Sequence, residues 1–185
     1  ADYSKSTDFS FRWAHKQDEK ARPNSRFNSN VNIVSNNYNK YNPSNTNSYL
    51  SNTFQSSVSY STNWKSKYFL TANLNHSQNT LNRTISFVLP ELSFSVNRFY
   101  PLRKKEQIGS PKWYENLSVD YRMNLKNQIE TYDSLLFEPE TLEKFRNGMK
   151  HNVNLSVPLK ILKFLNMTNS FSYTDRWYFQ TYEKN

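Results

Sequence analysis

The stretch Trp113–Lys126 alternates between apolar and polar side chains, and this pattern restricts what the chain can fold into. Its odd-numbered positions are nearly all apolar and its even-numbered positions are polar or charged. Successive side chains of a β-strand point to opposite faces, so the stretch predicts a two-faced strand. A globular strand usually has about 5–6 residues, whereas about 9–11 are needed to cross a bilayer at a tilt. The length therefore indicates a transmembrane barrel strand, and a strand of a soluble β-sandwich is the alternative that this stretch leaves open. Within the stretch, we expect four odd-numbered side chains to face lipid, namely Leu117, Val119, Tyr121 and Met123.

The composition combines low hydropathy with many aromatic residues. Mean hydropathy is -0.90, yet aromatic residues make up 16% of the chain. Disordered chains are poor in aromatic and β-branched residues, so low hydropathy alone does not indicate disorder here. A barrel with a wet interior reconciles both values, because only the lipid-facing half of each strand has to be apolar. The presence of only 2 Gly is unusual for a protein with tight hairpins.

The chain is basic, with a formal net charge of +9, which favours phosphate-bearing partners such as nucleic acid, anionic lipid or lipopolysaccharide. Its Lys and Arg residues are scattered over strands and loops, without an arginine-rich helix or a zinc-finger spacing, so nucleic acid is not an expected partner. No run of about 18 apolar residues predicts a transmembrane helix. The polar residues 1–8 carry no signal-peptide core, so we expect any export signal to lie outside this chain.

The alternation recurs along the whole chain, which we interpret as one region, residues 1–185, without a domain boundary. It predicts an all-β fold, an antiparallel transmembrane β-barrel segment of about eight long strands that forms part of a larger barrel. A short helix is expected around Glu140–Phe145. The expected strands are Asp8–His15, Arg26–Asn36, Thr53–Trp64, Lys67–Ser77, Arg83–Tyr100, Trp113–Glu130, Met149–Leu159 and Leu165–Phe179.

The segment Arg83–Tyr100 changes phase at Pro90-Glu91, which indicates either a hairpin or a β-bulge. Counting it as one bulged strand places the short turns at Lys65 and Leu162 on one side of the barrel. The long connections Asn37–Tyr49 and Thr131–Asn147 then fall on the other side, as expected of barrels whose two ends carry different loops. We therefore predict one bulged strand and a periplasmic position for the Lys65-Ser66 turn.

The same strand directions predict aromatic girdles at the two membrane interfaces. Four aromatic residues are expected near the periplasmic interface and one near the outer interface. These are Trp64, Tyr68, Tyr100 and Trp113 for the first, and Trp177 for the second.

The sequence offers no catalytic or metal-binding motif, and we expect neither an enzyme nor a cofactor. Its histidines, His15, His76 and His151, are isolated and lack paired-ligand spacing, and the chain has no cysteine. The polar stripe is more informative, because several cations project from it and would line the lumen if the apolar stripe meets lipid. Asp120 is expected to neutralise one of them. The candidates for contact with cargo are Arg12, Arg122, Lys126, Lys150 and Arg176.

Five segments together resemble the barrel region of LptD-like lipopolysaccharide-assembly proteins, in a divergent branch. The resemblance covers most of the chain and consists of strand and loop phrases. The segments are Phe11–Ile33 (FRWAHKQDEKARPNSRFNSNVNI), Asn75–Thr80 (NHSQNT), Leu89–Leu102 (LPELSFSVNRFYPL), Lys112–Phe137 (KWYENLSVDYRMNLKNQIETYDSLLF) and Phe145–Lys184 (FRNGMKHNVNLSVPLKILKFLNMTNSFSYTDRWYFQTYEK).

The resemblance implies a role in membrane biogenesis: a translocon in the outer membrane of a Gram-negative bacterium that passes lipopolysaccharide to the outer leaflet. It also implies an LptE-like lipoprotein plug and periplasmic Lpt bridge proteins as partners. The chain departs from a full member because it carries no jellyroll domain, no signal and no paired cysteines. Two alternatives are another outer-membrane barrel, such as a porin or a TonB-type receptor, and a soluble β-sandwich or adhesin module.

Overall fold

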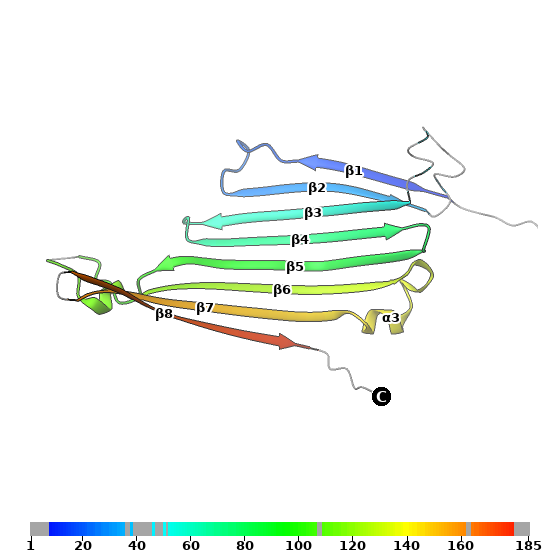
Figure 1. The fold of residues 1–185 in the computed structure, drawn as a ribbon. Helices are drawn as coiled ribbons and strands as arrows, with labels where there is room; N and C mark the ends of the chain where they lie inside the picture. The colour runs from blue at the N-terminus through cyan, green and yellow to red at the C-terminus, as the bar shows by residue number, and fades with distance from the viewer. Residues whose placement is uncertain are drawn as a thin grey trace, which may run out of the picture.

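The computed structural model describes residues 8–35, 52–106, 109–161 and 164–179, together with Tyr38, Thr46 and Leu50. These residues form an antiparallel sheet of eight strands that follow one another in chain order (Figure 1). The expected all-β, antiparallel arrangement is therefore confirmed. The strands are β1 (Ser10–Lys16), β2 (Ser25–Val34), β3 (Thr53–Trp64), β4 (Tyr68–Asn79), β5 (Thr84–Phe99), β6 (Ser118–Tyr132), β7 (Arg146–Ile161) and β8 (Leu165–Tyr178).

Six of the strands are much longer than those of ordinary globular domains. β3 and β4 have 12 residues each, β8 has 14, β6 has 15, and β5 and β7 have 16. A tilted strand needs about 9–11 residues to cross a bilayer. These six strands therefore have the length that a membrane crossing requires.

The strand register divides the sheet into an apolar face and a polar face. Residues directly opposite one another in an antiparallel pair lie on the same face. Tyr121 of β6 is opposite Val96 of β5 and Val153 of β7, and Val153 is opposite Tyr173 of β8. We call the face that carries Tyr121 the apolar face and its reverse the polar face. Val119 and Met123 share the apolar face as expected, whereas Leu117 precedes the strand.

The apolar face has little cover from the described part of the chain. Its hydrophobic side chains in the middle of β8 are exposed, Phe171 to 61% and Tyr173 to 53%. Buried hydrophobic residues among those described are limited to Val34, Phe54, Ile85 and Ile129. β1 and β8 are the outermost strands, and the sheet is open in the described residues (Figure 1). A sheet with one open apolar face needs apolar surroundings to be stable in this form.

The first residues of the expected Trp113 strand form a helical turn instead, which corrects the sequence-based boundary. Trp113–Asn116 is a 3-10 helix, η1, and β6 begins at Ser118. The backbone N–H of Lys112 donates to Glu115 Oε2 at 2.7 Å. This local hydrogen bond closes a capping box that competes with strand pairing. β6 then continues beyond Lys126 to Tyr132.

The phase change in β5 is a bulge within one continuous strand, as predicted. Val88 is opposite Asn75 of β4 and Glu91 is opposite Asn73, so β5 carries one extra residue between these pairs. The pairing of β5 with β6 shows the same extra residue in β5. The side-chain amide of Asn127 donates to Leu89 O at 2.7 Å and provides a partner for a carbonyl in the bulge. A second register shift, between Val96 and Phe99, was not predicted.

The strands end at two rims, which we name by their tryptophans. At the Trp64 rim, β3 turns into β4, while the Trp177 rim carries α3 (Pro139–Glu143), close to the expected helix (Figure 1). The η2 turn (Asp133–Leu135) lies in the same β6–β7 connection as α3. The β3–β4 turn needs no glycine, because Lys65 and Ser66 adopt left-handed φ values of 52° and 51°.

The predicted separation of short turns from long loops is only partly right. The β5–β6 connection, residues 100–117, is long but lies at the Trp64 rim, whereas the β4–β5 connection, residues 80–83, is short and lies at the Trp177 rim. Most of the expected loop Asn37–Tyr49, and Leu162 in the expected turn, lie outside the described residues. Loop length therefore does not distinguish the rims, and the periplasmic position of Lys65-Ser66 stays a prediction.

Candidate functional site

Four cations from three neighbouring strands meet on the polar face, and we call this group the wall cluster. Lys150 of β7 is directly opposite Asn124 of β6 on one side and Arg176 of β8 on the other. Arg122 and Lys126 flank Asn124 on β6, so each lies diagonally across from Lys150 at about 7–8 Å between Cα atoms. The members of the wall cluster are Arg122, Lys126, Lys150 and Arg176.

The wall cluster makes no ion pairs among the described residues, whereas Arg26 and Glu19 do pair, at 3.0 Å. Lys150 and Arg176 form a directly opposed pair of like charges, which destabilises a sheet. Glu91 is opposite Lys126 in the register but makes no ion pair with it. The cluster therefore carries an excess of positive charge on this part of the face, with Glu91 as the carboxylate directly opposite one member.

Asp120 does not neutralise the cluster, contrary to expectation. Its Oδ2 atom accepts a hydrogen bond from the side-chain amide of Asn154 at 2.7 Å. Asn154 Oδ1 in turn accepts from the Ser172 hydroxyl at 2.7 Å. The register explains this, because Asp120, Asn154 and Ser172 are direct partners across β6, β7 and β8. Asp120 therefore belongs to a row of polar side chains beside the cluster.

Arg12 lies on the polar face, as predicted, but away from the wall cluster. It is opposite Asn32 of β2, and four strands separate β1 from β6. At about 4.8 Å between neighbouring strands, this separation is roughly 20 Å or more. The five candidate cations thus share one face, but the sheet gathers only four of them.

The girdle aromatics occupy the rims that the strand directions predict. Trp64 is paired with Tyr68 at the β3–β4 turn, and Tyr100 and Trp113 lie in the connection at the same rim. Trp177 is paired with Met149 near the end of β8, at the opposite rim. Trp64, Trp113 and Trp177 are exposed.

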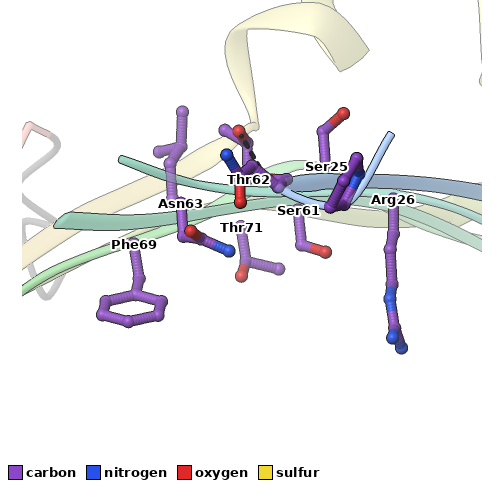
Figure 2. A pocket seen from close by; sticks show the side chains of 10 residues that line it. Ser25, Arg26, Ser61, Thr62, Asn63, Phe69 and Thr71 are labelled. Carbon is purple, nitrogen blue, oxygen red and sulfur yellow. Dashed lines mark hydrogen bonds between the residues drawn. The ribbon is translucent and has the colours of Figure 1, made fainter. Parts of the chain in front are cut away.

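A pocket of about 320 Å³ lies at the Trp64 rim between β2, β3 and β4 (Figure 2). Arg26, Phe69 and Thr71 extend to one side of the sheet and Ser25 to the other (Figure 2). The Thr62 hydroxyl donates to Asn24 O at 3.0 Å and ties β3 to the turn between β1 and β2. Because Arg26 is already paired with Glu19, this pocket offers mainly neutral hydrogen-bonding groups and one aromatic ring.

Two hydrogen-bonded pairs of polar side chains on the apolar face were not predicted from the sequence. The Tyr121 hydroxyl and His151 Nδ1 are 2.7 Å apart, and Asp175 is directly opposite His151 in the register. The indole N–H of Trp177 donates to Asp175 Oδ2 at 2.6 Å. The sequence did contain a signal for this. His151 and Asp175 are odd-numbered, like the apolar residues of the same two strands, and this places them on the apolar face.

The described residues contain no group of three or more His, Asp or Glu side chains able to hold a metal ion. No helix in this part of the chain has the length and apolar character needed to cross a membrane. The wall cluster can bind anions through charge and hydrogen bonding. It presents no nucleophile activated by a neighbouring base.

Comparison with known proteins gives one positive result. A family model described as "LptD protein" matches residues 1–185, while no curated protein and no solved structure matches the chain. The eight-stranded antiparallel sheet is consistent with a fragment of a β-barrel. Proteins of this family belong to the outer membrane of Gram-negative bacteria and take part in lipopolysaccharide transport. The chain is a member of the LptD protein family.

Proposed function

We propose that this chain forms part of the wall of an outer-membrane translocon that passes lipopolysaccharide to the outer leaflet. The apolar face contacts lipid and the polar face lines a water-filled lumen. Long strands with an apolar outer stripe and a polar inner stripe are the arrangement that a transmembrane barrel requires. The open apolar face of β8 and the Asn- and Ser-rich polar face support this assignment.

The wall cluster is the observation that supports cargo contact. Its four cations lie on three adjacent strands and lack ion-pair partners among the described residues. A patch of one charge sign attracts ligands of the opposite sign, and the phosphates of a lipopolysaccharide head group carry that charge. Arginine binds phosphate in a bidentate manner and lysine binds it as a point charge. The cluster thus provides a transient site for the head group during transit.

The partners in this proposal are an LptE-like lipoprotein that plugs the lumen and periplasmic Lpt bridge proteins that deliver the cargo. Energy for transport has to come from outside this chain, because the sequence contains no nucleotide-binding motif. Attraction of the head group by charge needs no energy input at the wall, only that the cations of the wall cluster are exposed to the lumen. Arg122, Lys126 and Arg176 are exposed, and Lys150 is partly exposed.

The direct test combines Arg122→Gln, Lys126→Gln and Lys150→Gln in the full-length protein. Glutamine keeps polarity and approximate size, and lumenal substitutions mainly tune selectivity, so folding is expected to persist. We expect delivery of lipopolysaccharide to the cell surface to fall several-fold. A photo-crosslinking residue at position 122 is expected to capture lipopolysaccharide in the otherwise unaltered protein.

The matched control removes three cations from the same face at β1 and β2, through Arg12→Gln, Lys16→Gln and Arg26→Gln. This variant is expected to deliver lipopolysaccharide normally. Normal delivery by the wall variant, together with no crosslink at position 122, would contradict the proposed cargo contact. Equal losses in the two variants would show that total charge matters and the position of the cluster does not.

A further inference from the structure

A second basic site lies at the Trp64 rim, outside the wall cluster. A pocket of about 590 Å³ is formed by the β3–β4 turn, the end of β5 and the loop that follows it. Four cations line this pocket and no acidic residue does. We call it the rim pocket, and its cations are Lys67, Arg98, Arg103 and Lys104.

The rim pocket depends on the second bulge of β5. The register shift between Val96 and Phe99 inserts an extra residue beside Asn97 and Arg98. The backbone N–H of Asn97 donates to Lys67 O at 2.8 Å, and its side-chain amide donates to Ser66 O at 3.2 Å. These two hydrogen bonds hold the end of β5 against the β3–β4 turn. They bring Lys67 and Arg98, which are distant in sequence, to the same pocket.

Aromatic rings position two of the cations. The ammonium group of Lys67 lies 4.5 Å from the centroid of the Phe99 ring, and the Arg103 guanidinium lies 3.8 Å from that of Tyr100. Cation–π contact fixes the direction of a side chain without using its hydrogen-bond donors. A guanidinium stacked in this way keeps its N–H groups free for a planar, bidentate acceptor such as phosphate.

The position of the pocket identifies the source of that phosphate. Phe99 is opposite Val119, so its ring belongs to the apolar face at the point where that face reaches the rim. A lipid whose acyl chains cover the apolar face would carry its head group to the height of the rim. Basic residues near an anionic membrane surface are attracted to it, and aromatic residues favour the same depth.

We propose that the rim pocket binds the phosphodiester head group of an anionic phospholipid in the leaflet that meets the Trp64 rim. This proposal rests on the proposed contact of the apolar face with lipid, and it concerns a site separate from the cargo-contacting wall. Its ligand is a resident membrane lipid that anchors this rim. The rim pocket thereby sets the depth of β3, β4 and β5 in the bilayer.

The experiment titrates the full-length protein, delipidated in detergent, with short-chain phosphatidylglycerol, and counts bound lipids by native mass spectrometry. Phosphatidylcholine, which has no net charge, is the lipid control. The rim variant combines Lys67→Gln, Arg98→Gln, Arg103→Gln and Lys104→Gln. Since one basic residue near an anionic surface contributes about five-fold in affinity, we expect at least about a ten-fold loss in this variant.

The matched control removes the same number of exposed charges from the same rim but outside the pocket, through Lys16→Gln, Lys20→Gln, Arg22→Gln and Lys160→Gln. It is expected to bind phosphatidylglycerol as the unaltered protein does. Equal weakening in both variants, or unchanged binding in the rim variant, overturns the proposal. If the rim variant does not fold, the double variant Arg98→Gln and Arg103→Gln replaces it, with Arg98→Lys and Arg103→Lys as the charge-preserving counterpart.

Two further arms identify the ligand. Inorganic phosphate that binds as tightly as the lipid overturns a lipid-specific site, and so does equal binding of phosphatidylcholine. A preference for lipid A over phosphatidylglycerol overturns the phospholipid assignment. Failure here is distinguishable from failure of the transport proposal, because delivery of lipopolysaccharide is measured in cells with the wall variant and lipid binding with the rim variant.

Discussion

At the scale of single residues, polar groups on the apolar face form hydrogen bonds with one another. The Tyr121 hydroxyl lies 2.7 Å from His151 Nδ1, and the two rings are stacked. His151 Nε2 is buried and has no hydrogen-bond partner among the described residues. A buried polar atom without a partner is costly in apolar surroundings. Loss of the hydrogen bond to Tyr121 would leave both ring nitrogens of His151 without a partner among the described residues.

Replacing Tyr121 by Phe removes that hydrogen bond and keeps the ring. We expect the free energy of unfolding to fall by about 1 kcal/mol, the usual net contribution of one hydrogen bond. Tyr173→Phe is the matched control, because Tyr173 lies on the same face, is exposed and makes no hydrogen bond through its hydroxyl among the described residues. Urea titration of the protein reconstituted in lipid measures both values. Equal stability of the two variants would contradict a stabilising role for the Tyr121–His151 contact.

At the scale of the strand, β5 shows how a proline is accommodated inside a long sheet. Proline has no backbone N–H for strand pairing and is tolerated at bulges. The bulge between Val88 and Glu91 contains Pro90, and both neighbouring strands adjust their register to it. At the bulge, the side-chain amide of Asn127 donates a hydrogen bond to Leu89 O.

Asn127→Leu removes the donor to the bulge and is expected to lower the free energy of unfolding by about 1 kcal/mol. Asn169→Leu is the control, because Asn169 lies on the same apolar face, is exposed and makes no hydrogen bond through its side chain among the described residues. Its replacement adds apolar surface to an apolar face and should be neutral or slightly stabilising. The same reconstituted unfolding assay compares them, and a neutral Asn127→Leu would show that the bulge does not need this amide.

At the scale of the whole molecule, the question is what covers the apolar face. The described residues provide one sheet, and a β-sandwich would need a second sheet packed on this face. Lipid is the cover that the proposed function supplies. Phe171, in the middle of β8, is exposed on this face, and its chain neighbour Ser170 is exposed on the polar face.

Phe171→Arg is therefore expected to destabilise the reconstituted protein by about 2–4 kcal/mol, the cost of a basic residue on the lipid face near the bilayer midplane. Ser170→Arg places the same charge on the polar face, one residue away, and is expected to change stability little. The difference between the two unfolding free energies is the diagnostic quantity. Equal tolerance would contradict contact between the apolar face and lipid.

Side-chain alternation was sufficient to predict the antiparallel all-β class and the shared face of Arg12, Arg122, Lys126, Lys150 and Arg176. The reason is that the period of two assigns each residue to a face without knowledge of its neighbours. At Pro90 the alternation left a hairpin and a bulge open, and the single bulged strand, with the count of eight, was chosen from the placement of the loops. Pairing between strands is a different kind of information. The opposition of Lys150 and Arg176, the binding of Asp120 to Asn154, and the meeting of Lys67 with Arg98 all depend on register, which comes from contacts between distant segments. The helical turn at Trp113 was not predicted either, because the apolar–polar alternation extends over these residues. The local hydrogen bond from the Lys112 backbone to Glu115 favours the turn over strand pairing there.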